Sequence, residues 1–387
     1  MIERRDLVVI GGGAMGTAAA WQAARRGLSV TLLERFAAGH NQGASHGSTR
    51  NFNQAYSDPE YVRLVEEAAT LWAELESEAG RTLIDRVGLV NHGQTAVLDA
   101  TEAALSSCGI ANELVSAREA QERWPQFRFR TNVLMLPQSG RVRAADALTA
   151  LRTTAEARGA DFRFEEPATS VLVKGDNRVV VETGAAVYEA RRVIIAVGAW
   201  SEKLFSDLLV LPRLRVTQEQ PVHFAPTTTD LWPSFNHFPD PNEPDDHYWL
   251  SPVYGMATPG EGIKAGWHGV GPVTDPDRRT FQAVPDQLAV LQRYAEEWLP
   301  GVDSRNLIPI SCTYTTTDTE NFVLERTGPI VIAAGFSGHG FKFTPAIGRI
   351  LVDLAEGRQS PAIFRHGVAL RNQEGPTRTA RSPAVSH

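Results

Sequence analysis

Two short segments in the C-terminal third of the chain carry residue types that could bind a ligand and react with it. Cys312 lies in the run ISCTYTTT, where one thiol is followed by a row of hydroxyl side chains. The deprotonated form of such a thiol is a nucleophile that can attack an electron-poor centre. Further along, residues 331–343 read VIAAGFSGHGFKF. Glycines at positions Gly335, Gly338 and Gly340 would let backbone N–H groups approach a planar or anionic ligand.

A second ligand site is indicated at the N-terminus. Residues 6–10 (DLVVI) are typical of a buried strand, and GGGAMG follows at 11–16 before a helical segment over 17–26. A further strand over 28–33 ends at Glu34. This order of strand, G-x-G-x-x-G turn, helix, strand and acidic residue is the fingerprint of a dinucleotide-binding unit.

Each residue of the fingerprint has a physical role. Gly11 allows the tight turn, Gly13 lets a pyrophosphate approach the backbone, and Gly16 lets the helix pack closely on the strand. The helix N-terminus supplies N–H groups and the positive end of its dipole. Glu34 favours a cofactor with a free ribose 2′-hydroxyl, which means FAD or NAD rather than NADP. The motif alone does not choose between FAD and NAD.

Length and composition exclude several classes of protein. At 387 residues the chain is too long for one ordinary core, which predicts two domains. A hydrophobic content of 42% with 21% charged residues is typical of a soluble globular enzyme. A net charge of −7 without basic blocks argues against nucleic acid or an anionic membrane as a partner. Because the two cysteines, Cys108 and Cys312, lie far apart, we expect no disulfide framework and a cytoplasmic location, and no metal site is indicated.

The elements that must position these residues are scattered along the chain. Strands of one parallel sheet are expected within 6–34, 160–198 and 330–335. Apolar spacing predicts helices over 61–79, 144–158, 288–299 and 348–356, and short strands and turns up to Arg143. Residues 226–247 are the least regular stretch, equally compatible with a lid and with a solvated loop.

We therefore predict an α/β fold (α+β overall) with two domains. A Rossmann-like nucleotide domain is built from discontinuous segments, and a second, substrate-binding domain is a mostly antiparallel β-sheet. The expected boundaries are 1–85, 145–210 and 320–370 for the first domain, 86–144 and 211–319 for the second, and 371–387 for a disordered tail.

Taken together, these segments resemble the monomeric sarcosine oxidase and N-methyltryptophan oxidase family, within the D-amino-acid-oxidase-like flavoproteins. The resemblance runs from Asp6 to about Arg358. It is most specific in SHGSTR (45–50), GIKAGWH (262–268), CTYT (312–315) and AAGFSGHGFKF (333–343). It implies covalently bound FAD and the oxidation of a secondary amine by O2 to an imine and hydrogen peroxide.

Three residues match positions next to the flavin in this family. Cys312 falls where the family joins its sulfur to the 8-methyl carbon of the flavin, whereas Cys108 matches no motif. Without that match, a free cysteine is more commonly a small buried hydrophobe. Lys264 matches a lysine that helps O2 reduction, because a cation stabilises developing superoxide. Arg50 matches an arginine whose charge supports the anionic reduced ring.

The substrate face shows one departure from the family. His268 and Tyr254 match positions that line it, with Tyr314 close by, and Lys342 matches the anchor of the substrate carboxylate. The family's second cation is an arginine, and Asn53 stands at that position in this chain. Loss of one cation of a buried clamp removes about 1.5–3 kcal/mol. Whether the substrate carries an α-carboxylate is therefore open at this point.

The family match extends to the remaining cofactor contacts. The positions predicted to contact the cofactor are Gly11, Gly13, Ala14, Met15, Gly16, Glu34, Arg35, Ser45, Thr49, Arg50, Gly198, Trp200, Cys312, Gly335, Gly338, His339, Gly340 and Lys342.

The resulting hypothesis is a monomeric FAD-dependent oxidase of an N-methyl amino acid-like secondary amine. Hydride would pass to flavin N5, the imine would hydrolyse, and O2 would be reduced to hydrogen peroxide. One alternative on the same fold is an oxidase of fructosyl amino acids or of cyclic imino acids. Another, of a different class, is a FAD- or NAD-binding dehydrogenase or binding protein without oxidase turnover.

Overall fold

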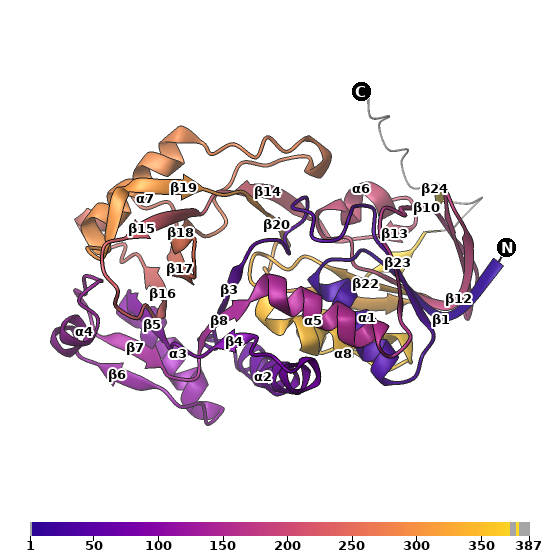
Figure 1. The fold of residues 1–387 in the computed structure, drawn as a ribbon, viewed down its shortest axis with the longest axis horizontal. Coiled ribbons are helices and arrows are strands. Elements are labelled where there is room, and N and C mark those ends of the chain that lie inside the picture. Colours follow the sequence, from indigo (N-terminus) through magenta and orange to yellow (C-terminus); the bar gives the residue numbers. More distant parts are fainter. Residues whose placement is uncertain (1, 372–376, 379–387) are drawn as a thin grey trace.

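A nine-stranded sheet organises the lobe on the right of Figure 1. The structure, a computed structural model, describes residues 2–371 and 377–378. The central strands β9, β2, β1, β12 and β22 are parallel. Such strands are buried on both faces, which explains apolar runs such as Ile330–Ala334. The strands are β1 (Ile2–Ile10), β2 (Val30–Leu33), β9 (Asp161–Arg163), β10 (Ala168–Gly175), β11 (Arg178–Thr183), β12 (Val187–Ile195), β21 (Val323–Thr327), β22 (Ile330–Ala334) and β24 (Thr377–Arg378).

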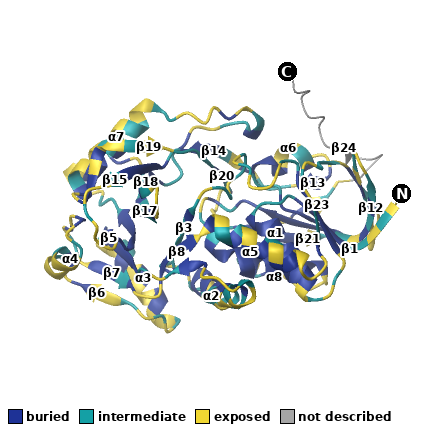
Figure 2. Ribbon diagram, viewed as in Figure 1, coloured by how far each residue is buried: buried dark blue, intermediate teal, exposed yellow. Residues whose placement is uncertain are grey.

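Four helices pack beside one face of this sheet (Figure 1). They are α1 (Ala14–Arg25), α2 (Pro59–Ala79), α5 (Ala144–Glu156) and α8 (Thr344–Ala355). Close packing of α8 on α1 requires Gly348, because an added Cβ would lie 2.6 Å from the Ala18 carbonyl oxygen. The helix α2 starts at Asp58, whose carboxylate accepts a 2.8 Å bond from the Glu60 N–H. The interior between helices and sheet is the largest buried region of Figure 2, with Trp21 and Trp72 fully buried.

An eight-stranded sheet organises the other lobe. All of its neighbouring strands are antiparallel except β16 and β5, which are parallel. Its strands are β5 (Leu89–Gly93), β6 (Glu113–Val115), β7 (Val133–Leu136), β15 (Val222–Pro226), β16 (Ser234–Phe238), β17 (Val253–Thr258), β18 (Gly262–Trp267) and β19 (Val302–Pro309). The helices of this lobe are α3 (Thr95–Ser107), α4 (Ala117–Arg123) and α7 (Pro285–Trp298).

The two faces of this sheet differ in character. Trp267 and Phe235 belong to an aromatic core that also contains Tyr294 of α7. Because side chains alternate along a strand, Tyr254 and Lys264 project from the opposite face.

Short elements join the lobes and position the site. The small sheets are β3 (Thr49–Phe52) with β8 (Gly140–Arg143) and β4 (Ile84–Asp85), β14 (Arg215–Glu219) with β20 (Cys312–Thr316), and β13 (Leu209–Val210) with β23 (Ala369–Leu370). The short helices are η1 (Gly198–Trp200), α6 (Ser201–Phe205), η2 (Pro244–Asp246), η3 (Pro276–Arg278), η4 (Phe341–Phe343) and η5 (Ala362–Phe364).

The predicted fold class is confirmed, and three local expectations need comment. The stretch up to Arg143 was expected to hold only strands and turns, yet it contains α3 and α4; Leu98, Leu105 and Ala120 bury the inner faces of these helices. The irregular 226–247 stretch contains β16, a strand paired on both sides. Most of the expected tail, 371–387, lies outside the described residues. Among the described helices, none is both long and apolar enough to cross a bilayer.

Candidate active site

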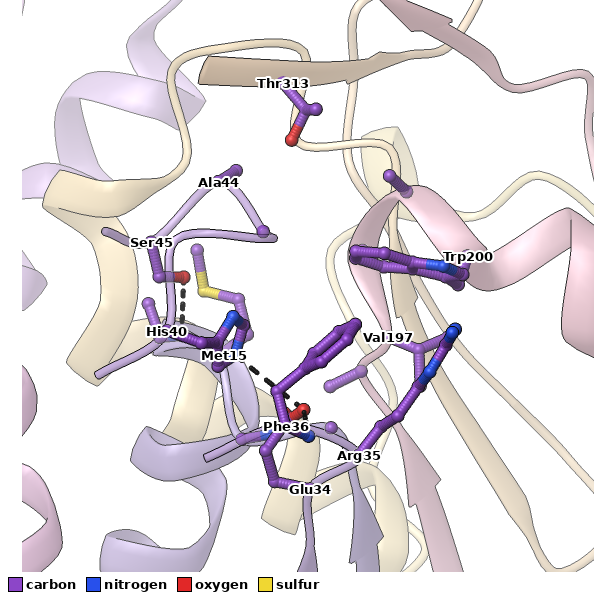
Figure 3. Close-up of a pocket in the computed structure, with 18 of the residues that line it drawn as sticks. Met15, Glu34, Arg35, Phe36, His40, Ala44, Ser45, Val197, Trp200 and Thr313 are labelled. Atoms are coloured by element: carbon purple, nitrogen blue, oxygen red, sulfur yellow. Dashed lines mark hydrogen bonds and ion pairs between the residues drawn. The ribbon is translucent and has the colours of Figure 1, made fainter. Parts of the chain in front are cut away.

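A cavity of about 1190 Å³ lies at the C-terminal ends of the parallel strands, the edge where open α/β sheets bind ligands. Ile10, Leu33 and Ala196 line it from the ends of β1, β2 and β12, and Cys312 lines it from β20. Figure 3 shows part of this wall, with Glu34, Arg35 and Phe36 at the end of β2 and Trp200 and Thr313 farther away. The cavity exceeds the ordinary range of small-molecule pockets, which is about 300–1,000 Å³, and its wall includes both the glycine turn after β1 and the Cys312 thiol.

The turn between β1 and α1 admits only glycine at two positions. Gly11 has φ +106°, and an added Cβ there would lie 2.4 Å from the Ala196 carbonyl oxygen. An added Cβ at Gly16 would lie 1.9 Å from the Gly11 carbonyl oxygen. The first turn of α1 is held by Ser45, whose hydroxyl accepts a 2.9 Å bond from the Ala14 N–H. This backbone cradle fits the pyrophosphate of a dinucleotide such as FAD.

The carboxylate of Glu34 is fixed at the edge of the cavity. It accepts bonds from the Gly12 N–H at 2.6 Å and from the Phe36 N–H at 2.9 Å. Each oxygen of a carboxylate has two lone pairs, so acceptor capacity remains for a ribose hydroxyl. The predicted place of Glu34 beside a nucleotide therefore agrees with its geometry.

The neighbouring Arg35 is engaged by a distant segment of the chain. Its guanidinium donates a 2.8 Å bond to Asp277, which also accepts a 2.8 Å bond from the Trp200 indole N–H. Lys203 lies 2.7 Å from the same carboxylate. Burial alone would raise the pKa of Asp277, but these three donors outweigh it and lower the pKa to about 2. Asp277 was not predicted, because its partners lie far from it in sequence.

The thiol of Cys312 lies on the cavity wall beside the loop after β2. Its sulfur is 3.9 Å from the Ala44 carbonyl oxygen and 3.8 Å from the Thr313 carbonyl oxygen. Both described cysteines are free, and Cys108 lies at the end of α3. Cys312 is thus a free thiol on the wall of the large cavity.

A buried lysine, Lys264, contacts Thr49, which precedes the cavity residue Arg50. The ammonium of Lys264 is 3.0 Å from the Thr49 carbonyl oxygen and 3.3 Å from the Thr49 hydroxyl. Only 4% of Lys264 is exposed. Burial, reinforced by the charge of Arg50, lowers the pKa of Lys264 to about 7. The guanidinium of Arg50 itself donates to the carbonyl groups of Thr49, Ala44 and His46.

A second buried lysine follows the Gly-rich turn. Lys342 is 5% exposed and donates to the Tyr56 hydroxyl at 2.7 Å and to the His339 carbonyl oxygen at 3.1 Å. Burial lowers the pKa of Lys342 to about 7. Within residues 2–371, no carboxylate forms an ion pair with Lys342 or Lys264. Each ammonium is therefore held by neutral acceptors alone, an arrangement that favours an anion from outside the chain.

Three side chains predicted for the substrate face lie together. The imidazole of His268 is 5.2 Å from the Tyr314 ring and 6.5 Å from the Tyr254 ring. Burial lowers the pKa of His268, and the charge of Lys342 lowers it further against the opposing effect of Glu320. Burial raises the pKa of both tyrosines. The three side chains therefore form a neutral surface next to the Lys342 ammonium.

The amide oxygen of the Asn53 side chain is already engaged in a hydrogen bond. It accepts a 2.7 Å bond from the Ala55 N–H, which closes a turn. Tyr56, which the sequence interpretation missed, provides the hydroxyl that contacts Lys342 in the same region. The only signal in the sequence was that Tyr56 lies three residues after Asn53, the position where the family has its second cation.

Some of the predicted residues line the large cavity and some do not. Those on its wall are Gly11, Gly13, Ala14, Met15, Glu34, Arg35, Ser45, Arg50, Gly198, Trp200, Cys312, Tyr314, Gly338 and Gly340. Those that do not line it are Gly16, Thr49, Asn53, Tyr254, Lys264, His268, Gly335, His339 and Lys342. Residues on the wall that were not predicted include Phe36, His40, Arg152, Phe164, Val197 and Asp277. Among the described residues, no group of three or more His, Cys, Asp or Glu side chains is arranged to hold a metal ion.

The fold and the cradle define a class, and comparison with known proteins agrees. Residues 6–354 match the family described as FAD dependent oxidoreductase, and the chain belongs to this family. The predicted family and the predicted class, a FAD-dependent amine oxidase of the sarcosine oxidase type, are confirmed at this level.

Individual relatives narrow the class. The chain is 32% identical to monomeric sarcosine oxidase of Bacillus sp. (strain B-0618) over 363 residues, covering 90% of this chain and 92% of that protein. It is also 32% identical to N-methyl-L-tryptophan oxidase of Salmonella typhimurium, covering 91% and 95%. Among solved structures, NikD, an unusual amino acid oxidase essential for nikkomycin biosynthesis, matches with TM-score 0.82 and 28% identity over 96% of this chain and 99% of that one.

Proposed function

We propose that the chain oxidises a secondary amine that carries an α-carboxylate, of the N-methyl amino acid kind. The observation that carries this proposal is Lys342, a buried ammonium that donates to the neutral oxygens of Tyr56 and His339 and lies over the rings of Tyr56 and Phe343. A substrate carboxylate would supply the missing negative charge through a charge-assisted hydrogen bond. The relatives named sarcosine oxidase and N-methyl-L-tryptophan oxidase act on compounds of this class by their names, which supports the proposal.

The neutral aromatic surface suits the amine end of such a substrate. An amine loses hydride readily only in its neutral form, and the buried surroundings of His268, Tyr254 and Tyr314 disfavour an added positive charge. These side chains orient the substrate and exclude water from it. The residues of the cradle would hold FAD, which would supply a hydride acceptor and a donor of electrons to O2.

Lys264 serves the oxygen half of the reaction. O2 becomes negatively charged as it is reduced, and a preorganised cation in a water-poor site stabilises that charge. Lys264 is held in place by both polar oxygens of Thr49, which leaves its ammonium oriented rather than mobile. The expected products are an imine, which water hydrolyses, and hydrogen peroxide. A dehydrogenase that passes electrons to another acceptor would not need this buried cation.

The predicted site for the substrate carboxylate contains one cation, Lys342, rather than two. This favours a second candidate class of substrate. The Asn53 amide is neutral and its oxygen closes a turn on the Ala55 N–H, so it does not supply the positive charge of the family's second arginine. A cyclic imino acid or a fructosyl amino acid, which offers other polar groups for recognition, would depend less on that arginine.

We also propose that the enzyme acts as a monomer; its cytoplasmic location and its domain boundaries stay predictions.

The function is tested by turnover under air. Purified protein is supplied with N-methyl amino acids, and peroxide is measured with a coupled peroxidase assay. The proposal expects peroxide and aldehyde in equal amounts. A flavin that the same substrates bleach without peroxide under air would contradict the oxidase and favour a dehydrogenase.

Covalent attachment at Cys312 is the most specific part of the proposal. We expect the yellow colour to remain with the polypeptide after acid precipitation, because a thioether survives denaturation. In Cys312→Ala the colour should leave with the supernatant, while Cys108→Ala, at the end of α3, should behave like wild type. Colour that washes out of the wild-type pellet would refute the attachment.

A further inference from the structure

A buried histidine lies directly across the sheet from Lys264. In the antiparallel pair of β15 and β18, His223 is opposite Lys264, so both side chains project from the same face. His223 is 5% exposed. Among the described residues its Nε2 atom has no hydrogen-bond partner, although it is buried. A buried imidazole nitrogen without a partner beside a buried amine calls for an explanation.

The other imidazole nitrogen, Nδ1, faces a partly exposed carboxylate. His223 Nδ1 is 3.5 Å from a carboxylate oxygen of Glu261, at the turn between β17 and β18. The Glu261 side chain is 41% exposed, whereas the His223 side chain is 4% exposed. The other oxygen of Glu261 accepts a hydrogen bond from the Ser48 hydroxyl. Ser48 precedes Thr49, the residue that holds the Lys264 ammonium. Glu261, His223 and Lys264 therefore lie in order from the surface inward, with an ion-pair distance from Glu261 to His223 and a cross-strand neighbour position from His223 to Lys264.

Few charged groups influence the protonation of His223 and Lys264. Burial and the charge of Lys264 lower the pKa of His223 to about 4, against the opposing effect of Glu261. Lys264 in turn is affected by Arg50, which lowers its pKa, and by Cys312 and Glu261, which raise it. Glu261 is the one carboxylate that influences both groups. His223 rests in its neutral form, which can accept a proton on one nitrogen and release one from the other.

We propose that Glu261 and His223 form a proton relay that returns a proton from solvent to Lys264 during the reduction of O2. The inference rests on the proposed oxidase function. Reduction of O2 to hydrogen peroxide takes two electrons and two protons. The electrons and one hydrogen arrive from the amine through the bound cofactor. The second proton comes from Lys264, whose N–H bond breaks as an O–H bond of peroxide forms. His223 then protonates the Lys264 amine and takes a proton from solvent through the Glu261 carboxyl group.

The test separates oxygen reduction from amine oxidation. Holoenzyme is reduced anaerobically with dithionite, mixed with O2, and the return of flavin absorbance is followed between pH 6 and 9. We expect His223→Gln and Glu261→Gln to slow reoxidation by at least about tenfold, near the lower end of general acid–base effects. Exogenous imidazole should restore the rate of His223→Gln, an effect that a structural role would not produce. His247→Gln and Glu102→Gln, at exposed positions, are the matched controls.

A second measurement does not depend on turnover. Competitive labelling of Lys264 with acetic anhydride, followed by mass spectrometry, reports the pKa of its amine. Removal of the Glu261 charge should lower this pKa further, because the carboxylate opposes its depression. If His223→Gln does not fold, the slower reoxidation expected of Glu261→Gln still tests the relay.

The possible outcomes are distinct. Wild-type protein that O2 does not reoxidise would overturn the oxidase function, and the relay with it. Rapid wild-type reoxidation with rates in both variants equal to those of the controls would overturn the relay alone.

Discussion

The two ends of the large cavity are built in different ways. At the predicted nucleotide end, backbone N–H groups and glycines form the cradle, and most of its parts lie between Leu7 and Glu34, with Ser45 and Ala196 added from outside this segment. At the other end, the wall is formed by side chains such as Arg50, Cys312 and Phe341, from β3, β20 and η4, and Lys264 of β18 lies beside this wall at Thr49. The first end is therefore specified locally by backbone shape, whereas the second depends on how the two lobes meet. Substitutions should affect the two ends in different ways, by excluded volume in one and by lost charge in the other.

The largest effect is expected from Gly16→Ala. The added Cβ would lie 1.9 Å from the Gly11 carbonyl oxygen, so the turn and α1 must separate and the cradle is lost. We expect protein without bound FAD, measured as flavin absorbance per polypeptide after gel filtration. Gly184→Ala is the control, because nothing lies within 4 Å of its added Cβ. Normal flavin content in Gly16→Ala would refute the steric account of the nucleotide end.

At the other end, Lys264→Met should leave the cofactor bound and remove a charge. We expect flavin reoxidation by O2 to slow by about 100- to 1,000-fold, the scale of one preorganised electrostatic group. Anaerobic reduction by the amine should change little, because Lys264 contacts Thr49 and not the substrate surface around His268. Lys174→Met, at an exposed position, is the control. Equal slowing of both half-reactions would mean that Lys264 supports the fold of the site rather than oxygen chemistry.

Lys342→Met should separate substrates by charge. Loss of a charge-assisted bond of about 1.5–3 kcal/mol predicts a KM about 10- to 100-fold higher for carboxylated amines. Matched amines without the carboxylate should be affected little. The comparison is made by steady-state oxygen consumption with the two substrate types side by side. A uniform loss with both types would contradict the assignment of Lys342 as the carboxylate anchor.

A separate effect is expected on stability. Burial lowers the pKa of Lys342 from 10.5 to about 7, so between these pH values the unfolded chain binds a proton that the folded chain does not. The free energy of unfolding should therefore rise with pH across this window, by up to about 1.4 kcal/mol per pH unit. Lys342→Met should be more stable than wild type at pH 7, and the difference in Tm should shrink towards pH 10. A difference in Tm that stays constant from pH 7 to pH 10 would show that the Lys342 amine does not cause the pH dependence of stability.

The same contrast explains what could be predicted from the sequence. The fingerprint around Gly11 is contiguous, so its strand, turn and helix followed from residue types alone. Arg35 was expected at the cofactor, yet it pairs with Asp277, 242 residues away. Only the folded chain brings Tyr56 to Lys342 and Glu261 to His223. Resemblance to a family supplied Lys264 and Lys342, but their neutral partners depend on tertiary packing.

The helix α3 shows a second limit of local inference, whereas α4 carries a start signal that was overlooked, because the Ser116 hydroxyl accepts a hydrogen bond from the Glu119 N–H. In α3, Leu98, Thr101, Ala104 and Leu105 form the buried face, but the flanking sequence contains no side-chain cap. Without a start signal, the segment was not distinguished from its neighbouring strands. The β16 strand was obscured in a similar way by the prolines and aspartates that surround it.

The most direct test of the account is anaerobic bleaching of the flavin absorbance by paired substrates. N-methyl amino acids are compared with matching N-methyl amines that lack the carboxylate, and with a cyclic imino acid and a fructosyl amino acid. The account predicts rapid bleaching by the carboxylated N-methyl compounds, with Lys342 as their single cationic anchor. Bleaching only by the carboxylate-free amines, or only by the fructosyl compound, would contradict it.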